Sequence, residues 1–116
     1  MSENKKIKLA ILDMYEGAAN EGMRCIKAIA QAQADFVDYK VFDVRSKNEV
    51  PDKGYDIYIS SGGPGSPFDG EGKEWEANYF KLVDQLWAHN ANGYERKKYF
   101  FGICHSFQMF RLHLDI

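Results

Sequence analysis

Short apolar segments alternate with longer amphipathic segments along this chain. Between the apolar runs, residues 21–33 and 73–89 carry apolar positions at helical spacing, and a further amphipathic pattern starts at residue 104. Strands that alternate with helices predict a parallel sheet with right-handed crossover connections. We therefore expect an α/β fold with an open, mostly parallel sheet of about four strands in three layers. The expected strands are residues 7–12, 36–42, 55–60 and 99–103.

Each of the two central helical patterns has one apolar side, which we expect to pack on the sheet. Cys25 lies beside the first stripe, and we expect it to be a small buried packing residue, as free cysteines commonly are. We interpret the aromatic side of the second helix as core packing and not as a cofactor site. The two stripes are Met23, Ile26, Ile29 and Ala30, and then Tyr79, Phe80, Val83, Leu86 and Trp87.

Composition narrows the class of protein without naming a function. The 116 residues suit one domain, and 45% hydrophobic and 28% charged residues are usual for a soluble globular protein. A net charge of −2 gives no electrostatic reason to expect nucleic acid or an anionic membrane as partner. No apolar run approaches the roughly 18–20 residues of a membrane span. The two cysteines, in a chain without an export signal, predict reduced thiols and a cytoplasmic location.

Two loops follow predicted strands and carry residues suited to chemistry. Ser60-Ser-Gly-Gly-Pro-Gly-Ser66 follows the third strand, and Gly102-Ile-Cys-His-Ser-Phe-Gln108 follows the fourth. Ligands of open parallel sheets collect at the carboxyl ends of the strands, so we expect both loops to face one crevice. Taken singly, the first loop is also consistent with a plain turn, and Cys104 with a buried cysteine at a strand end. A phosphate-binding loop is disfavoured because the Lys-Ser/Thr ending is absent.

Together, the two loops indicate a cysteine nucleophile with an oxyanion site. A strand, a tight turn at a small residue and a helix starting at Cys104 make a nucleophile elbow. The positive end of the helix dipole favours the thiolate form of such a cysteine. The main-chain N–H of His105 points to the same place in an elbow, and the N–H of Gly63 is a second oxyanion donor. Glycines at 62, 63 and 65 permit close approach of a ligand.

These two segments resemble the signatures of class I, triad-type glutamine amidotransferases. Gly102–Gln108 is similar to the nucleophile motif Gly-x-Cys-x-Gly-x-Gln, Ser60–Ser66 to the oxyanion loop, and residues 7–13 to the first strand. The resemblance implies a flavodoxin-like fold in which Cys104 attacks the side-chain amide of glutamine. It implies oxyanion donors at Gly63 and His105. It also implies a glutamine site at Gly62, Gly65 and Gln108, without metal or cofactor. Ammonia would pass to a synthetase partner or domain, as in the guanosine monophosphate synthase group.

The sequence departs from this family in two respects. Ser106 stands where the family has glycine, and the family's His-x-Glu motif is absent from these 116 residues. We do not expect His89, His105 or His113 to replace the missing base. We therefore expect residues 1–116 to form a single domain, the N-terminal part of an amidotransferase domain, which is inactive alone. The fourth strand is then an edge, and we expect self-association to cover its exposed apolar surface.

Two alternatives use the same crevice. One is a non-catalytic glutamine-binding or regulatory module, which the missing base and Ser106 favour. The other is a relative of the intracellular-protease-like group, in which a glutamate near the first loop holds the thiolate. Glu16, just after the first strand, is the candidate for that role.

Overall fold

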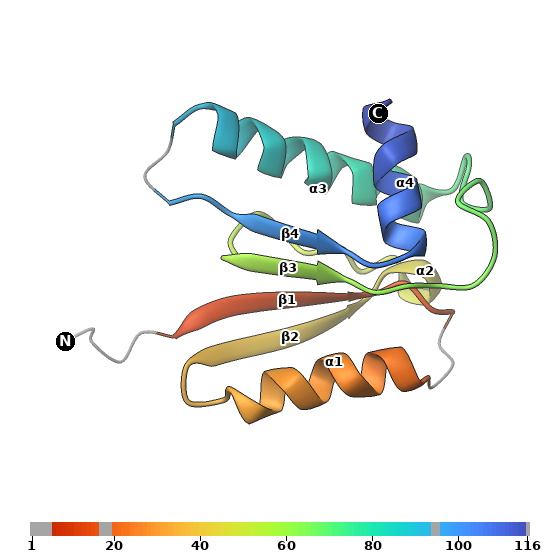
Figure 1. Cartoon of the computed structure of the whole chain (residues 1–116). Coiled ribbons are helices and arrows are strands. Elements are labelled where there is room, and N and C mark those ends of the chain that lie inside the picture. Colours follow the sequence, from red (N-terminus) through yellow and green to blue (C-terminus); the bar gives the residue numbers. More distant parts are fainter. Residues whose placement is uncertain (1–5, 17–19, 94–95, 116) are drawn as a thin grey trace.

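A parallel sheet with helices on both faces forms the molecule (Figure 1). The computed structural model describes residues 6–16, 20–93 and 96–115. The expected α/β class and its open, parallel, three-layer arrangement are confirmed. The strands are β1 (Ile7–Asp13), β2 (Val37–Asp43), β3 (Ile57–Ser60) and β4 (Tyr99–Gly102). The helices are α1 (Glu21–Ala32), α2 (Val44–Lys47), α3 (Glu74–Ala91) and α4 (His105–Leu114).

The strands lie in the order β2-β1-β3-β4, which matches the first four strands of a flavodoxin-like sheet. In the register, Leu9 of β1 lies beside Tyr39 of β2 and Ile57 of β3, and Ile57 in turn lies beside Tyr99 of β4. All strands run the same way, so their carboxyl ends share one rim (Figure 1). The loops after β1, β3 and β4 therefore meet there, and β2 and β4 are the two edges.

Alternate residues of β1, β2 and β3 supply two separate cores, because successive side chains of a strand point to opposite faces. Leu9 and Ile11 of β1 face α1, whereas Ala10 and Leu12 face α3 and α4. The core under α1 is the smaller one, with Met23 and Ala30 as its buried helix residues. The core under α3 and α4 holds Trp75, Tyr79, Leu82, Val83, Leu86 and Met109.

A one-turn helix, α2, was not expected from the sequence. The Asp43 side chain accepts a hydrogen bond from the Ser46 N–H at 3.1 Å, which caps the turn. Asn48 ends it in the left-handed region at φ 53°. A single turn has no apolar periodicity, so only the capping aspartate signals it. Helix α2 directs the Arg45 side chain toward the rim of the sheet.

Three residues expected in the core are exposed. Cys25 is exposed, Ile29 is 66% exposed and Trp87 is 61% exposed. Both helices do bury part of the expected stripe, but each contacts the sheet over a narrower arc than the stripe covers. Helical spacing shows which side of a helix is apolar, whereas the width of the sheet beneath it decides how much of that side is covered.

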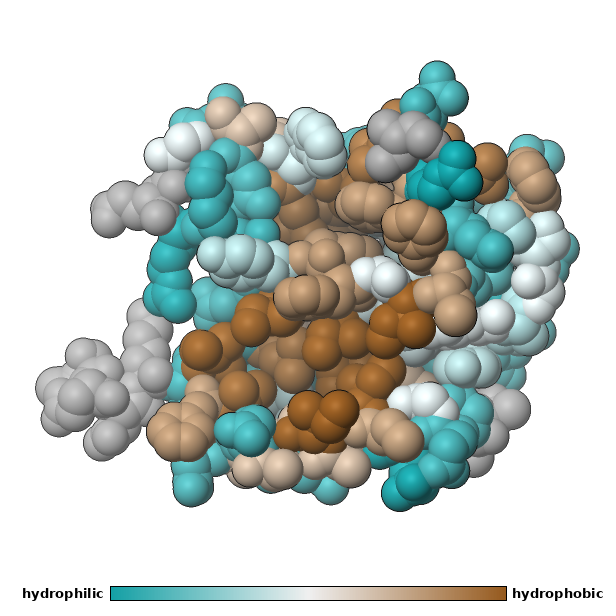
Figure 2. Space-filling view, in the orientation of Figure 1, coloured by the Kyte–Doolittle hydropathy of each residue, from teal (hydrophilic) through white to brown (hydrophobic). Residues whose placement is uncertain are grey.

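One face of the sheet remains uncovered beside β4. Figure 2 shows hydrophobic residues gathered over the strands on the side of the molecule that it presents. On β4 and just after it, Tyr99 and Phe101 are each 57% exposed and Ile103 is 41% exposed. They lie beside Ile57 and Ile59 of β3, which pack on the edge of the α1 core. Helix α1 covers β1 and β2 and leaves this part of the face open.

Candidate functional site

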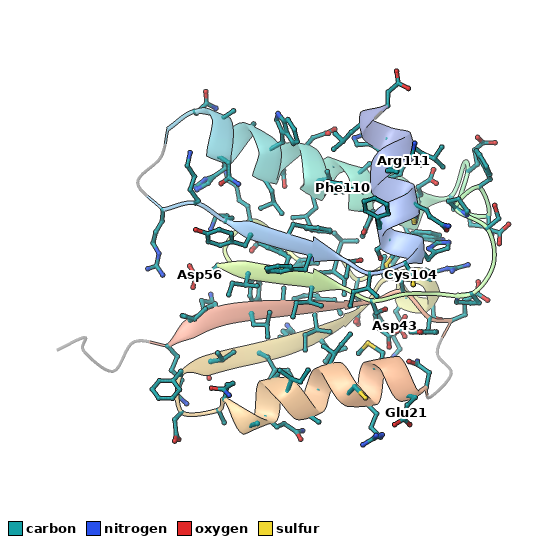
Figure 3. The ribbon with its side chains drawn as sticks, viewed as in Figure 1. Glu21, Asp43, Asp56, Cys104, Phe110 and Arg111 are labelled. Carbon is teal, nitrogen blue, oxygen red and sulfur yellow. The ribbon has the colours of Figure 1, made fainter. Side chains whose placement is uncertain are left out.

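Cys104 lies in a strained turn between β4 and α4, at the carboxyl rim of the sheet (Figure 3). Its φ of 48° and ψ of −106° are rare for a residue with a side chain. The turn is tight: a Cβ atom on Gly102 would lie 3.3 Å from the main-chain nitrogen of Phe107. Strand, strained residue and helix in this order have the geometry of a nucleophile elbow. The Cys104 side chain is exposed to solvent, as attack on a ligand requires.

The glycine-rich loop lies directly beside this turn. A Cβ atom on Gly62 would lie 3.7 Å from the Cβ of Cys104. A Cβ on Gly63 would lie only 2.5 Å from the carbonyl oxygen of Met14, so the loop is also pressed against the end of β1. Gly65 has a φ of 82°, which favours glycine. The two loops expected to share a crevice are thus in contact.

Two main-chain N–H groups in these loops are not used in hydrogen bonds between described residues. Among the residues that the structure describes, neither the Gly63 N–H nor the His105 N–H has a hydrogen-bond partner. His105 is the first residue of the ten-residue helix α4, where N–H groups have no partner within the helix. Both residues are the oxyanion donors expected from the sequence.

The Ser106 hydroxyl joins the elbow to the glycine-rich loop. Its side chain is fully buried and donates to the Ser61 carbonyl at 2.5 Å. The Ser60 hydroxyl lies 2.6 Å from it, and the Tyr79 hydroxyl lies 2.8 Å from that of Ser60. Burial raises the pKa of Tyr79, so its hydroxyl stays protonated at the end of this series of hydrogen bonds. Ser106 is thus held in the turn by hydrogen bonds.

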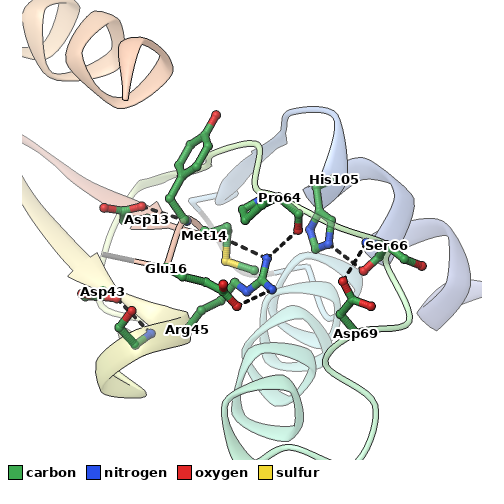
Figure 4. Close-up of polar contacts among 11 residues, drawn as sticks. Asp13, Met14, Glu16, Asp43, Arg45, Pro64, Ser66, Asp69 and His105 are labelled. Carbon is green, nitrogen blue, oxygen red and sulfur yellow. Dashed lines mark hydrogen bonds and ion pairs between the residues drawn. The ribbon is translucent and has the colours of Figure 1, made fainter. Parts of the chain in front are cut away.

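None of the three histidines is bonded to the thiol. Within the described ranges, the Cys104 sulfur has no hydrogen-bond partner at all. His105 is buried and its Nε2–H donates to the Ser66 carbonyl at 3.1 Å, which ties α4 to the glycine-rich loop (Figure 4). His113 forms a hydrogen bond with Asp84 of α3 at 2.7 Å. His89 forms a hydrogen bond with the carbonyl of Arg96 at 2.8 Å. Neither partner belongs to the elbow.

Arg45 is a central residue of the rim that the sequence did not indicate. Its side chain is 5% exposed, and its guanidinium donates to the carbonyls of Pro64 at 3.0 Å and Met14 at 3.3 Å. It also pairs with the Glu16 carboxylate at 2.8 Å (Figure 4). The guanidinium carbon of Arg45 lies over the Trp75 ring, 5.3 Å from the ring centroid. Arg45 thereby holds the loop after β1 against the glycine-rich loop. Nothing in the local sequence distinguishes it from other polar residues after β2.

The predicted glutamine-binding residues do not all line one cavity. Gly62 lies beside Cys104, whereas Gly65 faces a cleft of about 480 Å³ and Gln108 faces another of about 380 Å³. Pro64 and Gly65 of the glycine-rich loop line the first cleft. Pro67, which directly follows the loop, lines the second. The first also holds Arg45, Lys73, Glu16, Asp69 and Trp75.

Comparison with known proteins leaves the family open, since neither a family model nor a curated protein matches the chain. In the described ranges, no helix is long and apolar enough to cross a membrane. The same residues contain no cluster of three or more His, Cys, Asp or Glu arranged to hold a metal ion. The described residues at the rim offer a thiol at Cys104 and a group of charged side chains around Arg45.

Proposed function

We propose that this chain carries the nucleophile half of a glutamine amidotransferase-like site. The observation that supports it best is the contact between two loops: a solvent-exposed cysteine in a strained elbow, directly against a glycine-rich loop. The free N–H groups of Gly63 and His105 add the donors that a tetrahedral oxyanion needs. Gly62, Gly65 and Gln108 are the proposed contacts of the glutamine.

In the proposed reaction, the Cys104 thiolate attacks the side-chain amide carbon of glutamine. The negative charge that develops on the amide oxygen is held by the N–H groups of Gly63 and His105. Collapse of this intermediate forms a thioester and expels ammonia, and water then releases glutamate. Expulsion of ammonia requires a proton on the leaving nitrogen. A histidine bonded to the thiol could take the thiol proton and pass it on, but no described histidine makes that hydrogen bond. We therefore expect little or no turnover from residues 1–116 alone.

Labelling tests the proposal without requiring turnover. A chloroketone analogue of L-glutamine is expected to alkylate Cys104, and L-glutamine, but not D-glutamine, is expected to slow the reaction. Cys25 is the matched control because it is also an exposed free thiol, on α1. Mass spectrometry of the intact Cys104→Ala and Cys25→Ala variants distinguishes the two sites. Equal labelling of both cysteines, or no protection by L-glutamine, would refute the proposed role of Cys104.

A second candidate is a module that binds glutamine without hydrolysing it. The absence of a bonded base among the described residues favours it. It predicts saturable glutamine binding by calorimetry, with no ammonia released by the wild-type chain and no loss of affinity in Cys104→Ala. Ammonia release that disappears in Cys104→Ala and persists in Cys25→Ala would instead favour the hydrolase.

Glu16 does not favour the intracellular-protease-like alternative, because its carboxylate pairs with Arg45. Under the amidotransferase proposal, Glu16→Gln should leave the rate of Cys104 alkylation by iodoacetamide within about twofold of wild type. A large change in that rate would revive the alternative.

The proposed partners follow from the proposed chemistry. Glutamine is the small-molecule substrate, and a synthetase subunit or domain is the acceptor of the ammonia. We also propose that the chain acts in the cytoplasm. We further propose that it self-associates, because exposed apolar side chains remain on β4.

A further inference from the structure

The outer edge of β4 is open from Phe100 onward, whereas the main-chain N–H and carbonyl of Lys98, just before the strand, bond to the Asn90 side chain of α3. Tyr99 N–H donates to the Asp56 carbonyl and Ile103 N–H to the Ser60 carbonyl, so these residues turn their main chain toward β3. Within a strand, neighbouring residues turn their N–H and C=O groups to opposite sides. Phe100 and Gly102 therefore direct theirs outward, away from the sheet.

The two edges of the sheet differ in how they are protected. The β2 edge carries Asp38 and Lys40 along its length, and such charges discourage another strand from pairing. The β4 edge reads Tyr-Phe-Phe-Gly, without a charge, a proline or a bulge. An apolar edge of this kind is a template for a further strand.

The β4 edge is also complementary to itself. If a second copy pairs antiparallel about a two-fold axis at Phe101, Phe100 lies opposite Gly102 of the second copy, and their outward N–H and C=O groups form the hydrogen bonds. On the uncovered face, Phe101 then lies opposite Phe101, and Tyr99 opposite Ile103. Aromatic pairs and aromatic–β-branched pairs are among the favourable cross-strand combinations.

The exposed apolar area limits how large such a dimer interface can be. Tyr99 and Phe101 are each 57% exposed and Ile103 is 41% exposed. At about 200 Å² for a fully exposed large side chain, these three supply roughly 300 Å² of apolar surface on each copy. An interface at the small end of the usual range buries about 600 Å² per partner, of which about 60% is apolar. Pairing of the two edges covers only the sides of these side chains that face the second copy, so roughly 300 Å² per copy is the upper limit of their contribution.

We propose that two copies of this chain associate through their β4 edges into one continuous sheet, with Phe101 at the two-fold axis. This deepens the proposed self-association by assigning its surface and register, and it does not depend on the chemistry at Cys104. Interfaces of this small size are typical of weak, transient association, so we expect a dissociation constant on the order of micromolar.

Sedimentation velocity across the micromolar range tests the surface. Phe101→Lys is expected to weaken dimerisation by on the order of 100-fold or more, because each dimer loses two central aromatic side chains. Phe36→Lys is the matched control: Phe36 is 67% exposed but lies before β2, at the other edge, so the dimer should persist. Circular dichroism establishes that both variants are folded. A monomeric wild type, or a dimer unaffected by Phe101→Lys, overturns the proposal.

Cross-linking tests the register. In a chain without Cys25 and Cys104, Phe101→Cys should oxidise to a disulfide-linked dimer, because opposing residues at such a position have Cα atoms about 4.5 Å apart. Tyr99→Cys is equally exposed but faces Ile103 of the second copy, so it should remain reduced. Cross-linking of Tyr99→Cys and not of Phe101→Cys would overturn the register.

Discussion

Removal of the Ser106 hydroxyl tests the hydrogen bonds that join the elbow to the glycine-rich loop. The hydroxyl donates to the Ser61 carbonyl, so the Ser60 hydroxyl must be the donor in the 2.6 Å contact between Ser60 and Ser106. Tyr79 then donates to Ser60. In Ser106→Ala, the buried Ser60 donor loses its acceptor and the Ser61 carbonyl loses a donor.

The expected cost follows from these two bonds. Each buried neutral hydrogen bond contributes roughly 0.5–1.5 kcal/mol, so we expect Ser106→Ala to lower the free energy of unfolding by about 2 kcal/mol. For a domain of this size, that corresponds to a fall in melting temperature of about 8 °C. The change removes one oxygen atom and leaves the rest of the side chain, so the cavity contribution is small.

Urea unfolding followed by tryptophan fluorescence measures this difference. Trp75 is buried in the same core as Tyr79, so its emission reports the loss of that core. Ser46→Ala is the control, because Ser46 is exposed on α2, and we expect it to change stability by less than about 0.5 kcal/mol. If Ser106→Ala is as stable as Ser46→Ala, the proposed link between the elbow and the loop is not formed.

Two further substitutions test the packing and the electrostatics of the rim. Gly63→Ala should destabilise the fold by about 1–3 kcal/mol, because its Cβ would lie 2.5 Å from the Met14 carbonyl oxygen. In the control Gly62→Ala, the nearest contact of the Cβ is 3.5 Å away, so this change should cost much less stability. Equal midpoints of chemical denaturation for the two variants would contradict this prediction. Burial, with a contribution from the Asp43 carboxylate, raises the pKa of Asp13 above its ordinary value of 3.8. The folded state therefore binds a proton at Asp13 more tightly than the unfolded state does. As a result, the free energy of unfolding falls as the pH rises from 3.8 through the raised pKa. Asp13→Asn should therefore be more stable than wild type at neutral pH, and this gain should disappear as the pH falls to about 3.8. Melting temperatures measured across this pH range test the expectation. A gain that grows toward acid pH would contradict it.

Local patterns in the sequence determined the elements and their class. Apolar runs and helical spacing located strands β1 to β4 and helices α1, α3 and α4, because burial on one side imposes a period on the chain itself. The glycine and cysteine spacing likewise located the elbow and the glycine-rich loop, because tight turns require small residues at fixed positions. The order of elements was enough to predict that these loops share one rim.

The tertiary structure decided what depends on residues distant in sequence. Arg45 reaches Pro64 and Met14 across the rim, and Ser106 bonds to Ser61, contacts that no local pattern encodes. Whether Cys25 and Ile29 are buried depends on how much of the sheet α1 covers, and the periodicity of the helix does not contain that width. Sequence period reports which side of an element is apolar, and only the packing of the other elements determines which part of that side meets a partner.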